Sequence, residues 1–278
     1  MQQEFLTEKG LYAALGGSVV HDDELGIHHD FRDPENQRML LPFQPALSDV
    51  EGKAIGLGAL VTLLDTVCGL TALRHLKFRE STATLDLRID YLNATESGLD
   101  VIAEAHALQI FGAATRGSVV VKAAASHPGS KVPIAYAMGR FFRKTLPRNI
   151  TAHDYTSDRS AADFRNYRDL MGFLDEEPGR ITMPFRSGII GNGALPSIHG
   201  GAIAAHLQQA AIDIMKSSCT PNLATAHFSF QNYGSTRDIK AAAWVEKQGR
   251  VVSYVAATSR QDGIEGNVAS AVFTFLAS

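Results

Sequence analysis

The chain has 278 residues, of which 45% are hydrophobic and 20% are charged, and its formal net charge is −3. This length fits one large domain or two of ordinary size, with a globular composition. The slightly acidic balance excludes a generic nucleic-acid-binding surface, which needs an excess of Lys and Arg. The first ten residues carry no basic region or apolar run, and Cys68 and Cys219 show no metal-ligand spacing. We therefore expect no signal peptide and two free thiols in a cytoplasmic protein.

The N-terminal part of the chain is predicted to contain a short helix and a loop. Residues 4–15 have helical spacing and are followed by a Gly-Gly pair, which ends a helix. Residues 20–36 are polar and contain three histidines, His21, His28 and His29. Their spacing matches no metal-ligand signature, so we interpret the segment as a solvated loop and expect no metal site.

The stretch from Ala54 to Leu73 is apolar and contains one carboxylate, Asp65. Its length of about twenty residues could cross a bilayer. However, Asp65 would then lie near the centre of the span, where a charge costs about 2.5–3.5 kcal/mol. We therefore expect a buried central helix wrapped by a curved sheet. An acid in the middle of such a helix is neutral, paired or involved in chemistry.

The rest of the first half is predicted to be β-structure, because runs rich in Val and Ala alternate with glycine-bearing turns. Strands are expected at residues 38–43, 84–92, 99–108, 115–125 and 132–142. The polar, proline-containing segment that follows is typical of a linker.

The second half repeats this order of elements. An entry helix is expected at residues 160–173 and a central helix at 200–217, with strands at 180–186, 225–233, 239–247, 251–259 and 267–276. GALVTLLDT aligns with GAIAAHLQQ, MLLPF with ITMPF, and TLDLRIDYL with TAHFSFQNY. Such repeated landmarks indicate an internal duplication. We predict a first domain over 1–146, a linker over 147–158 and a second domain over 159–278, packed as a pseudo-dimer whose sheets can join edge to edge.

The order strand, helix, four strands, with GLGALVTLLDTVCG and HGGAIAAHLQQA as central helices, resembles the hotdog fold. This resemblance implies an α+β double hotdog, in which two antiparallel sheets each wrap a central helix. More narrowly, LLDTVCG followed by TLDLRIDYLNATESG resembles the acyl-CoA thioesterases of the phenylacetate-degradation type. In that family a His-Gly-Gly at one helix start offers backbone N–H groups to the thioester carbonyl. An acid nine residues after that His, across the interface, acts as base or nucleophile, and a strand hydroxyl helps to place the water.

Carried over residue by residue, the resemblance implies one complete composite site. The first half has the acid, Asp65, and the strand hydroxyl, Thr84, but lacks the His-Gly-Gly. The second half has His199, Gly200 and Gly201 but lacks the acid. A helix N-terminus suits a developing oxyanion, and a partly buried acid has a raised pKa. Each residue also has a structural alternative, because Asp65 could bond a neighbouring hydroxyl and His199 could cap its helix.

The matching positions elsewhere imply a degenerate second site. Gln208 stands where the acid would be, Thr225 is the strand hydroxyl, and Leu57 lies at the helix start. Gln208 can form hydrogen bonds but cannot take a proton or attack a carbonyl.

Three further residues are candidates for substrate contacts. Asn192 lies seven residues before His199, near where the family often places an amide that polarises the carbonyl. Arg250, in a turn, and Arg88, on a strand, could meet the phosphates of CoA, although a turn arginine is also simply solvated.

The function expected from this resemblance is hydrolysis of a small or medium acyl-CoA at the composite site. A non-catalytic acyl-CoA-binding protein and, less readily, a dehydratase of the same fold are alternatives. We expect no cofactor beyond the CoA of the substrate, no nucleic-acid or membrane partner, and assembly of several copies as an open possibility.

Overall fold

The computed structural model describes residues 19–30, 37–48, 52–77, 80–113, 116–145, 155–192, 195–216 and 222–277. The helix expected at 4–15, Cys219 and residues 147–154 of the expected linker lie outside the described residues. The domain boundary at the linker therefore stays a prediction.

The described strands form one large antiparallel sheet and one small hairpin. The strands of the sheet are β1 (His28–His29), β2 (Gln37–Leu41), β3 (Glu80–Tyr91), β4 (Val101–Phe111), β5 (Ser118–Ser126), β6 (Pro133–Thr145), β7 (Leu174–Glu177), β8 (Arg180–Met183), β11 (Asn222–Phe230), β12 (Ile239–Gln248), β13 (Val252–Arg260) and β14 (Ala269–Leu276). The hairpin consists of β9 (Ile190–Asn192) and β10 (Leu195–Ile198).

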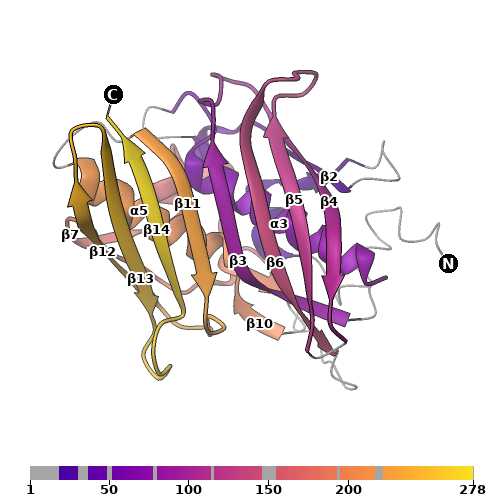
Figure 1. The fold of residues 1–278 in the computed structure, drawn as a ribbon. Coiled ribbons are helices and arrows are strands. Elements are labelled where there is room, and N and C mark those ends of the chain that lie inside the picture. Colours follow the sequence, from indigo (N-terminus) through magenta and orange to yellow (C-terminus); the bar gives the residue numbers. More distant parts are fainter. Residues whose placement is uncertain are drawn as a thin grey trace.

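The strand order has a pseudo-twofold at its centre (Figure 1). Across the sheet the order is β1-β2-β4-β5-β6-β3-β11-β14-β13-β12-β8-β7. Outwards from the β3–β11 pair, β6 corresponds to β14, β5 to β13, β4 to β12 and β2 to β8. Each half is thus the same six-stranded arrangement, with β1 and β7 as the matching outermost strands, and the expected double hotdog fold is confirmed.

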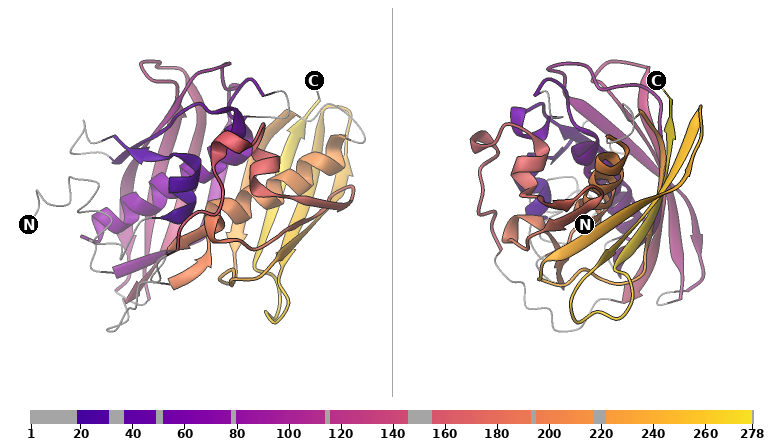
Figure 2. Two further views of the ribbon diagram at one scale, coloured as in Figure 1. Left: turned by 180° about the vertical axis from the view of Figure 1, so that it is seen from behind. Right: turned by 90° about the vertical axis from the view of Figure 1, so that its left-hand side faces the viewer.

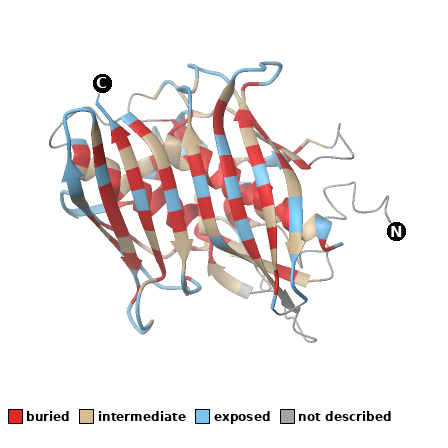
Figure 3. Cartoon of the chain, in the orientation of Figure 1, coloured by how far each residue is buried: buried red, intermediate tan, exposed pale blue. Residues whose placement is uncertain are grey.

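Strands β3 and β11 join the two halves by backbone pairing. Leu87 pairs with Phe228 and Ile89 with Ala226, and all four side chains are fully buried. Since the side-chain period of a strand is two, these buried pairs fix the register of the seam. Buried and exposed positions alternate along the strands on both sides of it (Figure 3).

Two long helices, α3 (Leu57–His75) and α5 (Gly200–Lys216), cover the same face of the sheet (Figure 2). Helix α3 packs on the first-half strands, α5 on the second-half strands, and the two helices contact each other. Among the described residues, α3 is the one helix long and apolar enough to cross a bilayer, but most of it is buried inside the protein. The expectation of a buried central helix therefore fits the fold.

Contact between the helices depends on a glycine at the start of α5. A Cβ atom on Gly201 would lie 2.7 Å from the Cα atom of Thr62 in α3, closer than carbon atoms normally approach. The absence of a side chain at this position lets the first turn of α5 lie directly on the backbone of α3.

Some local expectations were wrong. Residues 20–36, expected as a solvated loop, contain helix α2 (Val20–Leu25), in which His21 and Asp22 are buried. The entry helix expected at 160–173 is reduced to a 3₁₀ turn, η3 (Ala161–Asp163), and the short helix α4 (Tyr167–Met171). Asn166 caps α4 and Gly172, in the left-handed region, ends it. These two signals delimit α4.

The close approach of Gly201 to α3 yields a stability prediction. Gly201→Ala should lower the free energy of unfolding by about 1–3 kcal/mol, because the new methyl group overpacks the helix contact. Urea unfolding measures it. Gly69→Ala in α3 is the control, since its Cβ would meet Phe141 at an ordinary 3.5 Å. Here alanine should add up to about 1 kcal/mol through helix propensity. Equal stability of the two variants would contradict the tight contact.

Candidate active site

A cavity of about 390 Å³ lies where the two halves meet. Its polar end contains Asp65 and Thr84 from the first half and His199 and Gly200 from the second. The remaining lining is largely apolar and includes Leu70, Leu73, Phe141, Phe142, Ile203 and Phe230. The structure therefore brings Asp65 and Thr84 of the first half into one cavity with His199 and Gly200, which lie more than 100 positions later in the sequence.

Asp65 lies in the middle of α3 and is 4% exposed. Its Oδ1 accepts a hydrogen bond of 3.0 Å from the Thr84 hydroxyl. The neighbouring hydroxyls of α3 do not bond it. Thr62 bonds the Gly58 carbonyl and the Tyr167 hydroxyl, and Thr66 bonds groups outside α3. The strand hydroxyl is therefore the side chain that holds Asp65.

A β-bulge aims Thr84 at Asp65. Thr84 pairs with Phe141 of β6, whereas Asp86 pairs with Arg140, so β3 has one extra residue at Leu85. The extra residue switches the alternation of the strand. Thr84 and Leu87 therefore share the helix-facing side, although they are three positions apart and would face opposite sides in a regular strand.

Burial raises the pKa of Asp65 to about 6, and this shift is partly opposed by hydrogen bonds from Thr84 and from the Gly201 N–H. Above this pH the carboxylate is ionised while still largely desolvated. Such a group is a stronger base than an ordinary surface aspartate.

His199 caps helix α5. The Gly201 N–H donates to His199 Nδ1 at 3.0 Å and also points towards Asp65. The N–H of Gly200, the first residue of α5, has no acceptor within the helix. A Cβ on Gly200 would lie 2.7 Å from Asp65 Oδ2. The cap thus occupies the Gly201 donor, while Gly200 presents the helix start beside the acid.

The other nitrogen of the His199 ring leads to a residue that sequence reasoning missed. Nε2 lies 3.3 Å from the Thr66 hydroxyl, which in turn donates to Asp22 Oδ1 at 2.9 Å. Asp22 belongs to α2. Burial and the neighbouring His21 lower the pKa of His199 to about 3. The ring is therefore neutral at physiological pH and serves as a hydrogen-bonding group.

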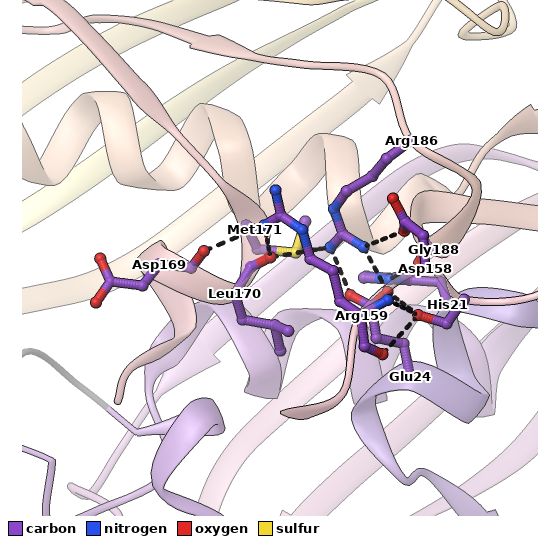
Figure 4. Close-up of polar contacts among 10 residues, drawn as sticks. His21, Glu24, Asp158, Arg159, Asp169, Leu170, Met171, Arg186 and Gly188 are labelled. Atoms are coloured by element: carbon purple, nitrogen blue, oxygen red, sulfur yellow. Dashed lines mark hydrogen bonds and ion pairs between the residues drawn. The ribbon is translucent and has the colours of Figure 1, made fainter. Parts of the chain in front are cut away.

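Helix α2 is fixed to the second half by a buried ion pair (Figure 4). The Arg186 guanidinium contacts the Glu24 carboxylate, and both side chains are almost completely buried. Next to this pair, His21 Nδ1 donates to the Gly188 carbonyl at 2.9 Å. The chain then continues to Ile189, whose carbonyl accepts the His199 N–H at 2.8 Å. The ion pair therefore supports the loop that carries His199.

The pseudo-equivalent position in the other half is closed. Gln208 is 1% exposed, and its Oε1 accepts a hydrogen bond of 2.6 Å from the Tyr91 hydroxyl. Thr225 pairs with Asp90, next to the buried pair of Ala226 and Ile89. Its side chain therefore lies on the outer face of the sheet, away from the helices. This position has no acid, and Thr225 does not supply it with a hydroxyl.

The start of α3 is covered as well. Leu57 begins the helix, and a Cβ on the next residue, Gly58, would lie 2.4 Å from the Tyr167 ring. The Tyr167 ring therefore fills the space beside the start of α3, whereas the corresponding space beside the start of α5 is the cavity.

The structure does not bring the two candidate arginines into the cavity. Arg88 is exposed on the outer face of the sheet and forms an ion pair with Asp90 at 2.7 Å. Arg250 is exposed beyond the end of β12, beside the end of β14. The cavity lies at the opposite end of the neighbouring strand, at Phe230 of β11. Asn192 ends β9, and its side chain lies outside the described residues. No group of three His, Cys, Asp or Glu side chains gathers at metal-binding distance in the described part of the chain.

Two family models match the chain, one in each half. The thioesterase superfamily model covers residues 57–128, and the acyl-CoA thioesterase N-terminal domain model covers residues 191–276. Together they span more than half of the chain and contain Asp65, Thr84 and the His199–Gly201 segment. The chain belongs to the thioesterase superfamily. In this chain the model named for an N-terminal domain matches the second half.

Several solved structures share the fold of this chain. The tesB protein of Mycobacterium avium subspecies paratuberculosis is 13% identical, with a TM-score of 0.61 over 91% of this chain and 96% of its own. A protein assigned as thioesterase II from Thermobifida fusca is 11% identical, with a TM-score of 0.61 over 94% and 98%. One assigned as a thioesterase from Novosphingobium aromaticivorans is 13% identical, with a TM-score of 0.59 over 87% and 95%. Comparison with curated proteins gives no match. At these identities the likeness establishes the fold. It does not distinguish the phenylacetate-degradation type from other thioesterases of this fold.

The raised pKa of Asp65 predicts a pH-dependent stability. The folded protein binds this proton more tightly than the unfolded chain, whose pKa is near 3.8, so unfolding free energy falls as pH rises from about 4 to 6. Asp65→Asn should therefore be more stable than the wild type at pH 7, by up to about 3 kcal/mol. Near pH 4 the two should be equal. Urea unfolding at both pH values checks this, and a variant that is less stable at pH 7 would contradict it.

Proposed function

We propose that the protein hydrolyses an acyl-CoA thioester at one composite site between its two halves. The observation that carries the proposal is the meeting of a desolvated acid with a helix start: Asp65 from α3 lies against Gly200, the first residue of α5. Membership of the thioesterase superfamily supports thioester hydrolysis in general. The acyl-CoA substrate and the single composite site are our inference.

In this proposal the thioester carbonyl oxygen accepts a hydrogen bond from the Gly200 N–H. The positive end of the α5 dipole adds to the stabilisation of the negative charge that develops on that oxygen. The contribution of one such donor is typically 10²–10³ in kcat. The neutral His199 takes no proton in this step but keeps the neighbouring Gly201 donor occupied.

Asp65 supplies the base. Above pH 6 its carboxylate removes a proton from a water molecule held by Asp65 and Thr84, and the water oxygen attacks the carbonyl carbon. The C–S bond then breaks, and the proton on Asp65 passes to the leaving thiolate of CoA. Direct attack by Asp65 is the covalent variant of the same scheme and needs the same ionised carboxylate.

The shape of the cavity is compatible with a small or medium acyl group. Apolar side chains from both halves, such as Leu70, Phe141 and Phe230, line the part beyond the polar end. Burial of each methylene group against them contributes about 0.8 kcal/mol. The reaction as proposed needs no cofactor other than the CoA of the substrate, and we place the protein in the cytoplasm.

The composite site predicts unequal effects of matched substitutions in the two halves. Asp65→Asn should lower kcat for acyl-CoA hydrolysis by about 10²–10⁴, the usual loss for a general base. Gln208→Ala should leave turnover within a few-fold, because Gln208 bonds Tyr91 and supplies no acid. Release of free thiol from a panel of acyl-CoAs measures both.

These variants also separate an enzyme from a binding protein. A binding protein would hold acyl-CoA equally well with or without the Asp65→Asn change and would release no thiol. Equal losses in the two variants, with folding and binding intact, would refute the one-site proposal and move the reaction to the neighbourhood of Gln208.

Removal of the Thr84 hydroxyl should shift the pH dependence of the reaction. The hydrogen bond from Thr84 lowers the pKa of Asp65, so Thr84→Val raises that pKa. The acidic limb of the kcat/KM profile should then move to higher pH by about one unit. Thr84→Ser keeps the hydroxyl and should retain the wild-type limb. An unshifted limb in the valine variant would exclude Asp65 as the titrating group.

A further inference from the structure

Helix α2 places a second carboxylate beside His199, outside the cavity lining. Asp22 is 2% exposed and lies 3.9 Å from His199 Nε2, on the side of the ring opposite to Asp65. Asp65 Oδ2 lies 3.9 Å from His199 Nδ1. The imidazole therefore stands between two buried acids, and its protonation pattern determines which one it can bond.

The hydrogen bonds determine this pattern. Because the Gly201 N–H donates to His199 Nδ1, that nitrogen is an acceptor and carries no proton. The single proton of the neutral ring is therefore on Nε2, where the Thr66 hydroxyl oxygen accepts it. The Thr66 hydroxyl has one hydrogen, and it is donated to Asp22 Oδ1. The hydrogen bonds thus all run in one direction, from the Gly201 N–H through His199 and Thr66 to the Asp22 carboxyl group. The acceptor at Asp22 fixes that direction.

We propose that Asp22 is a positioning residue of the thioesterase site, which acts through Thr66 to hold His199 in the Nε2–H tautomer. In this tautomer Nδ1 caps α5 and keeps the Gly201 N–H occupied, so that the Gly200 N–H is the donor presented to substrate. The catalytic consequence rests on the proposed function, whereas the tautomer can be observed directly.

Loss of the acceptor at Asp22 would reverse the bonds. The Thr66 hydroxyl would be free to donate to Nε2, and the ring proton would move to Nδ1. Nδ1 could then no longer accept from Gly201, and its proton would face Asp65 Oδ2. A hydrogen bond to the ionised carboxylate makes it a weaker base. The α5 cap and the basicity of Asp65 would be lost together.

The surroundings of Asp22 favour a substitution that keeps the fold. Helix α2 is held independently by the Glu24–Arg186 ion pair and by the bond from His21 to Gly188 (Figure 4). Burial and the nearby charges of Asp23 and Asp65 raise the pKa of Asp22 well above its ordinary value, partly opposed by the hydrogen bond from Thr66. A protonated carboxyl group and an asparagine amide have the same shape and the same neutral carbonyl acceptor, so Asp22→Asn should preserve the network.

The experiment compares Asp22→Asn and Asp22→Val by ¹⁵N NMR of histidine-labelled protein, with His199→Gln to assign the His199 signals. Long-range ¹H–¹⁵N correlations show which ring nitrogen carries the proton. Wild type and Asp22→Asn should show the Nε2–H tautomer, and Asp22→Val should show Nδ1–H. In Asp22→Val, kcat should fall roughly 10–100-fold, the range for residues that orient a functional imidazole. KM should change little, and Asp22→Asn should stay near wild type.

The control is Asp23→Val, which makes the same replacement at the next, exposed residue of α2. It should change neither the tautomer nor kcat. If Asp22→Val does not fold, Thr66→Val removes the hydroxyl that links His199 to Asp22. This variant should also lose the hydrogen bond from Nε2–H to oxygen, and its kcat should fall.

Three outcomes overturn the proposal: an Nδ1–H tautomer in the wild type, an unchanged tautomer in a folded Asp22→Val, or an Asp22→Asn variant as impaired as Asp22→Val. The last would mean that a negative charge rather than an acceptor is required. Failure of the proposed function looks different, because wild-type protein would then release no thiol from any acyl-CoA while the tautomers still followed the expected pattern.

Discussion

The backbone pairing of β3 with β11 is the constraint on which the rest of the molecule depends. It makes one sheet of two and places α3 and α5 side by side on a common face. With the register fixed by buried pairs such as Leu87 and Phe228, the start of α5 comes to lie at the middle of α3. Gly201 then permits contact at backbone distance. A slip of two residues along this seam would shift one half by roughly 7 Å relative to the other. Asp65 and Gly200 would then no longer be in contact, so the cavity depends on the seam as much as on its own side chains.

Much of the fold and the polar end of the cavity could be predicted from the sequence, because their signals are local. An apolar run with one acid indicates a buried helix, and His-Gly-Gly before a second apolar run indicates a helix start. Repetition of the landmarks supplied the long-range information that a single copy lacks. It showed that Asp65 and Gln208 occupy equivalent positions, whereas the pairing of Asp65 with the other half's helix start was implied by the resemblance to the thioesterase family. The structure places these groups where that pairing requires.

The remaining features depend on partners remote in sequence. Residues 20–25, VHDDEL, have the composition of a solvated segment, but Glu24 is neutralised by Arg186 and His21 bonds Gly188, more than 160 positions away. Only Gly26, in the left-handed region, signals the end of a helix there. The bulge at Leu85 also leaves no clear pattern. Strand β11 has a matching register shift between Leu223 and Thr225, so buried Leu223 rather than Thr225 occupies the position of Thr84. Arg250 lies in the expected turn, but at the end of the strands remote from the cavity.

The unequal distribution of groups between the halves has a consequence for the covalent linkage. The first half holds Asp65 and Thr84 and the second holds His199 and Gly200. If the halves were separate chains, pairs of first halves would contain two acids and no His-Gly-Gly helix start, and pairs of second halves would contain the reverse. Only the mixed pair would have a complete site, and random pairing of equal amounts would leave about half of the pairs without one. Fusion in one chain sets the ratio at one to one and makes every folded molecule the mixed pair.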